Sequence, residues 1–239
     1  MNFIRQLTKR LLTACVPPQR LLTRGPRCAP TVPPRLALTF DDGPHPIHTA
    51  RLLDALQAAG AAATFFVIGK EAERYPNLIQ RMVQEGHEVA NHTWTHSEPA
   101  KTTPAEFLAE VRRTDELLIE LTGRIPLSMR PPKGELNWTK LCGLWRQEKT
   151  VSLWSADPKD YRMNDAGEMA QWCAGYQPRD GDVVLLHDNH PWAIGAVTGM
   201  QSRGVFERFQ AVTVSELTGR TVCGTATGAS IRRISSVKL

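Results

Sequence analysis

The sequence has few cysteines and no long hydrophobic run. Its five cysteines are far apart, and no two of them form a CxxC pair. This spacing excludes a zinc ribbon and a dense disulfide scaffold, and it favours separate thiols in a reducing compartment. No apolar run approaches the ~20 residues that a helix needs to cross a bilayer. The 239 residues, 41% hydrophobic and 22% charged, instead have the composition of one sizeable globular domain.

Positive charge is scarce in the middle of the chain. Residues 1–35 contain seven basic residues and no acidic one, and residues 219–239 contain four basic residues and no acidic one. Residues 36–218 therefore hold 18 of the 29 basic residues and all 24 acidic ones, which gives them a net charge of −6. Nucleic-acid enzymes usually carry positive charge on the folded face that meets phosphate. We therefore expect no nucleic-acid partner. We divide the chain into a basic, Pro-rich N-terminal tail or linker (1–35), a domain (36–218) and a basic C-terminal tail (219–239).

The first residues resemble a targeting segment only in part. The stretch Leu12–Cys15 is similar to a lipoprotein cleavage box, but the apolar stretch before it is too short for a signal peptide. The apolar residues upstream have helical spacing among basic ones, which is compatible with weak contact to an anionic membrane surface, although a basic tail is the preferred interpretation. We expect a bacterial protein that is cytoplasmic or membrane-peripheral, and a monomer.

Strand-like and helix-like segments alternate from residue 36 onward. The pattern predicts helices over 48–60, 75–86 and 103–123, the last with a capping box between Thr103 and Glu106 and with Gly123 at its end. It predicts strands over 36–40, 63–69, 87–92, 125–130, 150–155, 182–188 and 209–214. Strands that alternate with helices are typical of parallel βαβ units, so the predicted fold class is α/β.

Polar side chains follow five of the predicted strands. Parallel α/β folds bind ligands at the carboxyl ends of their strands, so these side chains are expected to share one site. They are Asp41 and Asp42, His92, Arg130, Asp157 and Asp160, and His187 and Asp188.

Two adjacent aspartates and two histidines predict a metal site. His92 and His96 are four residues apart, which would place both imidazoles on one side of a helical turn, although an isolated HxxxH is more often a packing feature. Asp41 and Asp42 repel each other unless a cation lies nearby. One could bind a divalent cation while the other takes a proton from a water whose pKa the cation lowers. The alternative is that DDGP only caps a turn.

Five segments together resemble one family. "TFDDGP", "NHTWTH", "RPPKG", "WSADPKDY" and "LLHD" have the order and spacing of the polysaccharide deacetylases, the NodB-homology enzymes of carbohydrate esterase family 4, over about 36–218. The resemblance implies a distorted parallel (β/α) barrel. It also implies metal-dependent removal of acetyl groups from N-acetylated sugars, or from O-acetylated sugars in some members.

The resemblance also implies a role for each site residue. Asp41 would be the general base, held by Arg130, and His187 the general acid, kept protonated by Asp160. The implied ligands of a divalent metal, most often Zn²⁺ with Co²⁺ or another ion as a substitute, are Asp42, His92 and His96. The implied substrate and oxyanion residues are Pro132, Lys133 with its backbone N–H as oxyanion donor, Tyr161, and Leu185 beside the acetyl methyl group.

Two positions depart from the family pattern. Lys133 stands where an aromatic residue is frequent. This indicates either a preference for an acidic or phosphate-linked glycan or a lysine that points to solvent, and the sequence favours neither. Tyr161 replaces a common tryptophan and can still form a groove wall.

Three functions remain open at this point. The leading one is de-N-acetylation of GlcNAc-type sugars in a polysaccharide such as peptidoglycan or exopolysaccharide, in a chitooligosaccharide, or on a lipid carrier. The second is deformylation of a lipid-linked formamido sugar. The third, a non-catalytic glycan-binding relative, is disfavoured because the base, the acid and all three metal ligands are present.

Overall fold

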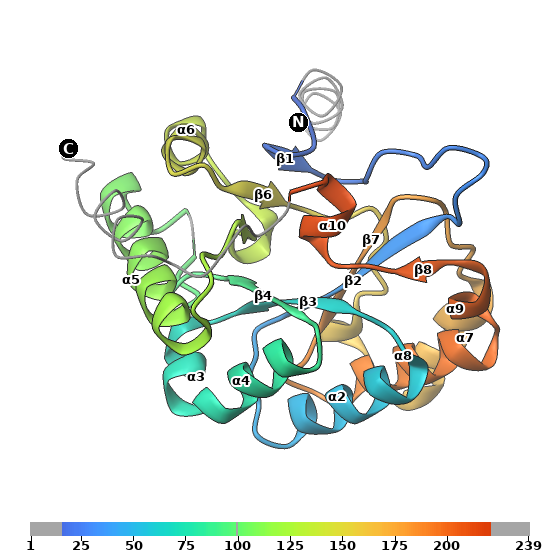
Figure 1. Cartoon of the computed structure of the whole chain (residues 1–239). Helices are drawn as coiled ribbons and strands as arrows, with labels where there is room; N and C mark the ends of the chain where they lie inside the picture. Colours follow the sequence, from blue (N-terminus) through green and yellow to red (C-terminus); the bar gives the residue numbers. More distant parts are fainter. Residues whose placement is uncertain (1–15, 99, 221–239) are drawn as a thin grey trace.

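A computed structural model describes residues 16–98 and 100–220 of the chain (Figure 1). The stretch similar to a lipoprotein box, the apolar residues upstream of it and the C-terminal tail beyond residue 220 lie outside these residues. In the described part, no helix combines the length and the apolar character that a membrane crossing requires. Cys28, Cys142 and Cys173 are free thiols there, as the scattered spacing predicted.

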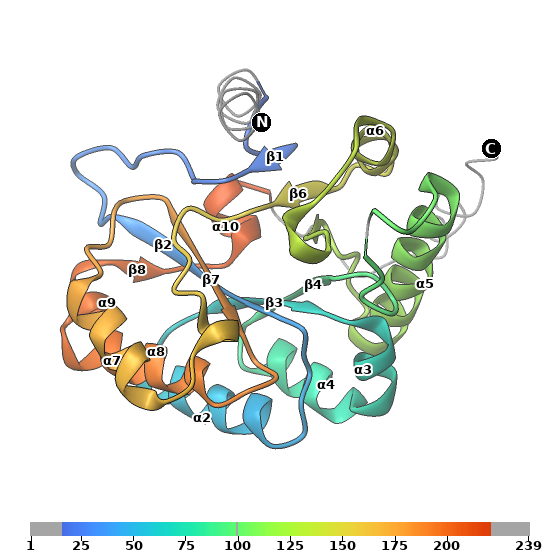
Figure 2. The same cartoon turned by 180° about the vertical axis from the view of Figure 1, so that it is seen from behind.

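The described residues form a parallel sheet that curls into an incomplete barrel, with most helices on its outer face (Figures 1 and 2). The spatial order is β1-β6-β5-β4-β3-β2-β7, and β8 pairs with β2. All pairings are parallel, which confirms the predicted α/β class. The strands are β1 (Leu21–Leu22), β2 (Arg35–Asp41), β3 (Ala63–Val67), β4 (Glu88–Asn91), β5 (Ser128–Met129), β6 (Thr150–Ser152), β7 (Asp182–His187) and β8 (Gln210–Ala211).

The three helices predicted from sequence are present, and others were missed. The longest helix has the predicted capping box and ends at Gly123 in a left-handed conformation (φ 67°). One missed helix contains Gly195 and Gly199, which weaken the helical signal. A Cβ at Gly199 would lie 2.9 Å from the sulfur of Cys173, so this glycine permits close packing against the preceding helix. The helices are α2 (His48–Ala59), α3 (Gly69–Arg74), α4 (Pro76–Gln84), α5 (Pro104–Thr122), α6 (Trp138–Arg146), α7 (Ala166–Gly175), α8 (Trp192–Ser202), α9 (Val205–Arg208) and α10 (Val214–Thr218), with 3-10 turns η1 (Pro132–Gly134) and η2 (Asp160–Arg162).

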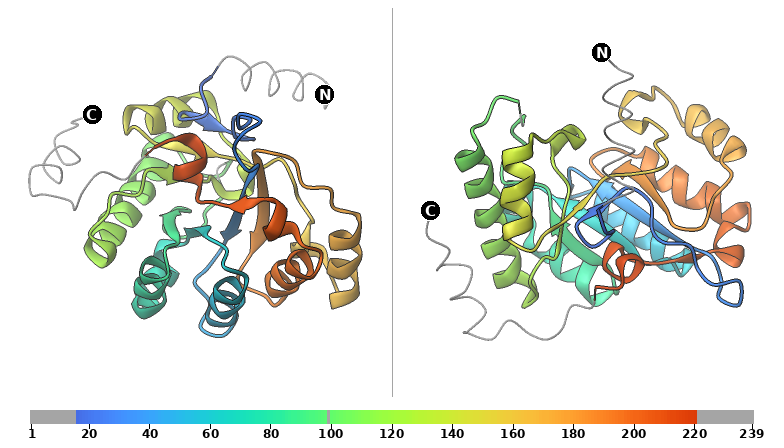
Figure 3. Two further views of the ribbon diagram at one scale, coloured as in Figure 1. Left: turned by 45° about the vertical axis from the view of Figure 1, so that its right-hand side comes forward. Right: turned by 90° about the horizontal axis from the view of Figure 1, so that it is seen from above.

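The strands present different residues to the two faces of the sheet. In β2, Leu36, Leu38 and Phe40 pack in the cluster that contains the leucines of α2 and residues of α8. The alternate residues point to the concave face, where Ala37 packs in a second cluster with Val214 and Leu217 of α10. Figure 3 shows the helices arranged around the curled sheet. Because successive side chains alternate between faces, Asp41 continues the inner row at the carboxyl end of the strand.

Part of the segment before residue 36 packs against the sheet. Leu21–Leu22 pair with β6, and Leu22 is fully buried within the inner cluster. Figure 1 shows this strand beside β6, at the edge of the sheet. Two residues of the predicted N-terminal tail or linker thus contribute a strand to the sheet and a side chain to the core. Two apolar residues between prolines are too few to give a periodic signal.

Candidate active site

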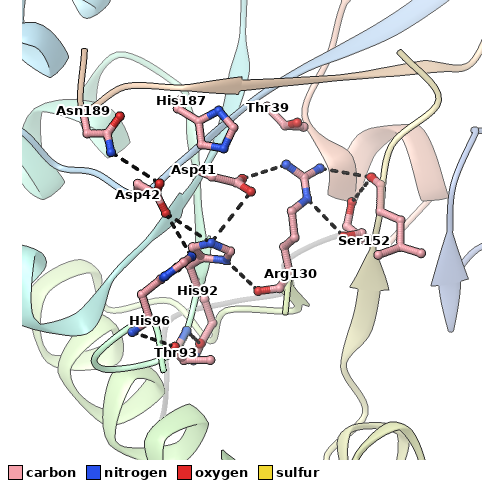
Figure 4. A network of polar contacts seen from close by, with 12 residues as sticks. Thr39, Asp41, Asp42, His92, Thr93, His96, Arg130, Ser152, His187 and Asn189 are labelled. Atoms are coloured by element: carbon pink, nitrogen blue, oxygen red, sulfur yellow. Dashed lines mark hydrogen bonds and ion pairs between the residues drawn. The ribbon is translucent and has the colours of Figure 1, made fainter. Parts of the chain in front are cut away.

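The carboxyl ends of the strands bring the predicted site residues together (Figure 4). Asp41 is the last residue of β2, and it lies in register with Phe66 of β3 on one side and His187 of β7 on the other. Its side chain is buried, with 4% of its surface exposed. The sheet thus places one carboxylate and one imidazole on adjacent strand ends.

Arg130 is fully buried and holds Asp41 in place. Its Nη1 donates to Oδ1 of Asp41 at 2.7 Å, and its Nε and Nη2 donate to the carbonyls of Ser152 and Leu153 at 3.1 Å. The guanidinium also lies 4.2 Å from the ring centre of Phe66. Burial lowers the pKa of Arg130, and Asp41 opposes that effect. Each of these two buried side chains therefore balances the charge of the other.

Asp42 faces a different set of partners. It has a left-handed backbone (φ 75°), and its Oδ1 lies 3.4 Å from Nε2 of His92 and 3.4 Å from Nε2 of His96. Its Oδ2 accepts a hydrogen bond from Asn189 at 3.3 Å. Burial opposes ionisation of Asp42, but the surrounding imidazoles outweigh it and lower the pKa to about 2. Asp42 is therefore a carboxylate at any physiological pH.

The two histidines lie in a loop, which corrects the predicted helical turn. They follow β4, with Thr93 (φ 68°) and His96 (φ 58°) in left-handed conformations. Glu110 of α5 fixes this loop by accepting hydrogen bonds from the backbone N–H groups of Trp94 and Thr95. The two imidazoles do lie close together, as predicted. Their proximity comes from a loop that is anchored to α5, a helix later in the sequence, and not from a helical turn.

Each imidazole presents one nitrogen to Asp42. Nδ1 of His92 lies 2.7 Å from the carbonyl of Arg130, which leaves Nε2 free to bind a metal. Burial lowers the pKa of His92, but the two aspartates reverse this and raise it. Burial and the neighbouring His92 lower the pKa of His96. His96 is therefore neutral near pH 7.

This donor set fits a divalent cation. Oδ1 of Asp42 is buried without a hydrogen-bond partner among the described residues, although it lies between two imidazole nitrogens. Ligands at 2.0–2.2 Å around a tetrahedral Zn²⁺ lie about 3.3–3.6 Å apart, and the two measured separations of 3.4 Å agree with this. Two imidazoles and one carboxylate also leave a fourth coordination position for water or substrate.

His187 lies on the other side of the two aspartates from His92 and His96 (Figure 4). It pairs with Asp160. Nδ1 of His187 lies 2.7 Å from Oδ1 of Asp160, and its backbone N–H donates to Oδ2 at 2.7 Å. Asp160 is fully buried. Burial lowers the pKa of His187, but the hydrogen bond to Asp160 and the charge of Asp41 raise it to about 9. This imidazole therefore carries a proton at neutral pH.

Comparison with known proteins identifies the family. The family model described as polysaccharide deacetylase matches residues 29–145. A chitooligosaccharide deacetylase of Bradyrhizobium sp. is 39% identical over 156 residues, which cover 64% of this chain and 70% of that protein. A peptidoglycan-N-acetylglucosamine deacetylase of Bacillus cereus is 32% identical over 187 residues, which cover 76% of this chain and 87% of that protein. The chain belongs to the polysaccharide deacetylase family.

A solved structure supports the same assignment for the fold. The peptidoglycan deacetylase PdaC of Bacillus subtilis superposes with a TM-score of 0.73 at 32% identity, over 81% of this chain and 93% of that structure. The match spans only 38% of the full-length PdaC protein. The NodB-type barrel implied by the motifs is therefore confirmed.

The predicted substrate-side residues of this family member are not all equally close to the proposed metal ligands. Lys133 has a left-handed backbone (φ 57°), and its half-exposed side chain donates to Glu98 at 2.5 Å, so its charge is already paired. Pro132 and Leu185 are buried. Tyr161 is 49% exposed, with its ring centre 5.4 Å from that of His187. Their assigned roles toward oxyanion, methyl group and glycan stay predictions.

Sequence reasoning gave no role to one buried carboxylate beside the site. Asp188 is buried, accepts a hydrogen bond from Thr49 at 2.5 Å, and donates its backbone N–H to the carbonyl of Asp41. A Cβ at Gly43 would lie 2.1 Å from its Oδ2. Burial raises the pKa of Asp188 to about 7, with a further contribution from Asp42. Its position after a predicted strand placed it among the side chains expected at the site, but nothing in the sequence indicates Thr49 as its partner.

Proposed function

We propose that this protein is a metal-dependent hydrolase that removes N-acetyl groups from GlcNAc residues of a glycan, with peptidoglycan and chitooligosaccharides as the first candidates. The observation that carries the proposal is the separation of two carboxylates: Asp41 is bound to Arg130, and Asp42 faces two imidazoles. The names of the Bradyrhizobium and Bacillus cereus relatives support the substrate class.

Asp42, His92 and His96 would hold the metal, for which we propose Zn²⁺. Their separations, and the unpartnered oxygen of Asp42, support this choice. When bound, the cation would lower the pKa of a water molecule and polarise the acetyl carbonyl.

Asp41 would act as the general base. Arg130 occupies its Oδ1, while Oδ2 lies 3.8 Å from Nε2 of His92 and so faces the proposed metal ligands. A carboxylate in this position can accept the proton of the attacking water near neutral pH. Arg130 would hold the carboxylate in place and balance its charge, which is the role of a positioning residue.

His187 would donate the proton that the leaving amine needs. An amine leaves poorly as an anion, and the pKa of about 9 ensures that His187 is protonated at neutral pH. Asp160 stabilises that imidazolium and fixes its orientation. The backbone N–H of Lys133 would complete the site by donating to the oxyanion.

The surroundings suit an extended sugar chain. An open depression lies beside the metal ligands, lined by Asp42, Pro44, His45, Ile68, Glu71, His96 and Asn189. The exposed ring of Tyr161 stands next to His187 and could pack against a pyranose. We propose that the glycan crosses this surface between Tyr161 and the depression.

The deciding experiment measures acetate and formate release. Metal-stripped and Zn²⁺-loaded protein is incubated with chitooligosaccharides, peptidoglycan, exopolysaccharide and lipid-linked amino sugars, with the Asp41→Asn variant as control. Acetate release from GlcNAc oligomers that requires Zn²⁺ and fails in the variant supports the proposal. Formate without acetate points to the deformylase, and glycan binding without release of either acid points to a non-catalytic protein.

A further inference from the structure

Three ionisable side chains form a second cluster next to the proposed metal site. They are Asp160 in η2, His187 at the end of β7, and His190 in the loop before α8. Nδ1 of His187 lies 2.7 Å from Oδ1 of Asp160, and Nε2 of His190 lies 3.9 Å from Oδ2 of the same carboxylate. One ligand atom from each residue lies within 4.8 Å of the other two.

The ring nitrogens of His190 have the surroundings expected of metal ligands. Both ring nitrogens are buried, and within the described ranges neither has a hydrogen-bond partner. Burying a polar group without a hydrogen-bond partner is energetically unfavourable. The proposed deacetylation gives His190 no task. Burial lowers its pKa, so a lone pair is available at neutral pH.

We propose that Asp160, His187 and His190 form a second Zn²⁺ site. It binds Zn²⁺ more weakly than the first site does, and Zn²⁺ bound there inhibits the enzyme. The donor set repeats the chemistry of the first site, with two imidazoles and one carboxylate. The distances from Nδ1 of His187 to Oδ1 of Asp160 (2.7 Å) and from Nε2 of His190 to Oδ2 (3.9 Å) lie on either side of the tetrahedral spacing. In the first site both imidazoles lie 3.4 Å from the same oxygen of Asp42. Side chains must therefore shift to bind the ion, which makes this site the weaker one.

The inhibitory effect follows from the role of His187, and so it rests on the proposed function. A zinc ion bound to a ring nitrogen displaces the proton that His187 shares with Asp160. The metal-bound imidazole is no longer an imidazolium, so it cannot readily donate a proton to the leaving amine. Zinc would thus activate the enzyme at one equivalent and inhibit it at higher concentration.

Stoichiometry tests the second site without reference to activity. Metal-stripped, untagged protein is titrated with Zn²⁺ by calorimetry. We expect two ions for the wild type, the second bound about tenfold or more weakly. His190→Ala and the more conservative His190→Gln should each bind one. The matched control is His48→Gln, which removes a neighbouring histidine outside the cluster and should leave two ions. A single ion in the wild type at millimolar Zn²⁺, two ions in both His190 variants, or loss of the second ion in His48→Gln would each overturn the assignment.

Activity then tests the inhibition. Each variant is compared with its own rate at one equivalent of Zn²⁺, and the His190 variants should need about tenfold more Zn²⁺ than the wild type for half-inhibition. Equal sensitivity to Zn²⁺ would contradict the inhibitory role. If no form hydrolyses any substrate, the proposed function fails, while the binding stoichiometry still decides whether the second site exists.

Discussion

Asp41 and Asp42 are adjacent in the sequence, yet their carboxylates bind different partners. Asp41 ends an extended strand and pairs with Arg130 at 2.7 Å, whereas Asp42 adopts a left-handed conformation and turns toward two imidazoles. The backbone changes from an extended to a left-handed conformation between the two residues. This change points the carboxylate of Asp41 toward Arg130 and that of Asp42 toward the two imidazoles. The two carboxylates can therefore share one strand end, because each has its own positively charged or imidazole partners.

This separation predicts that metal binding and catalysis can be disrupted independently. Asp41→Asn should leave the Zn²⁺ affinity nearly unchanged and lower kcat by about 10²–10⁴-fold, since a general base contributes that much. Asp42→Asn should lower the Zn²⁺ affinity by about 10–100-fold or more, because it weakens a direct ligand. Calorimetry and acetate release measure the two effects. Loss of Zn²⁺ binding in Asp41→Asn would show that the two roles are reversed.

The pH profile should reveal the acid. His187 must be protonated to act, and its pKa of about 9 means that kcat/KM is retained below that pH and falls as the pH rises through it. A cation bound at Asp42 would repel the His187 imidazolium, so the alkaline limb of the kcat/KM profile would lie at a somewhat lower pH. Asp160→Asn removes both the charge and the carboxylate acceptor, so the alkaline limb should move to clearly lower pH.

The control for this experiment is Asp157→Asn. Asp157 lies on the same segment but accepts its hydrogen bond from the backbone of Lys159, so the limb should not move. An unchanged alkaline limb in Asp160→Asn would mean that a group other than His187 supplies the proton.

Arg130 should be important for stability as well as for catalysis. Replacing it with Met leaves Asp41 buried without a cation, and breaking a buried pair in this way costs about 3–5 kcal/mol in the free energy of unfolding. The double variant Asp41→Asn/Arg130→Met should recover part of this loss, because no unpaired charge remains. The exposed pair Arg74–Glu71 offers a control, since Arg74→Met should cost about 0–1 kcal/mol. Urea unfolding measures all three variants, and equal losses for both single variants would contradict the buried-charge argument.

The positions of the strand ends were predictable because the strands are marked by clear apolar runs in the sequence. The apolar runs of β2, β3 and β7 are long enough to read as strands, and parallel strands must place their carboxyl ends on one rim. The capping box of α5 was likewise encoded within four residues. These features depend on neighbours in sequence, so the sequence sufficed.

The parts that were missed depend on contacts distant in sequence. Glu110 fixes the histidine loop from 15 residues away, and Lys133 is neutralised by Glu98 from 35 residues away. Strand β1 has only two residues and exists because β6 offers it a partner. The cluster of His190 with Asp160 also requires the folded barrel. No local pattern encodes such pairings.

The packing of Gly43 against Asp188 yields a final prediction. A Cβ at Gly43 would lie 2.1–2.4 Å from the carboxylate of Asp188, which is buried and hydrogen-bonded to Thr49. Gly43→Ala should therefore destabilise the protein by about 1–3 kcal/mol, as overpacking does. It should also lower Zn²⁺ affinity by displacing the adjacent Asp42.

The control for this prediction is Gly175→Ala. A Cβ at Gly175 meets nothing within 4 Å, so this variant should change stability by less than about 0.5 kcal/mol. Adding Asp188→Ala to Gly43→Ala removes the clash, so the double variant should bind Zn²⁺ more tightly than Gly43→Ala alone. If it does not, the carboxylate of Asp188 is not what constrains the loop that presents Asp42.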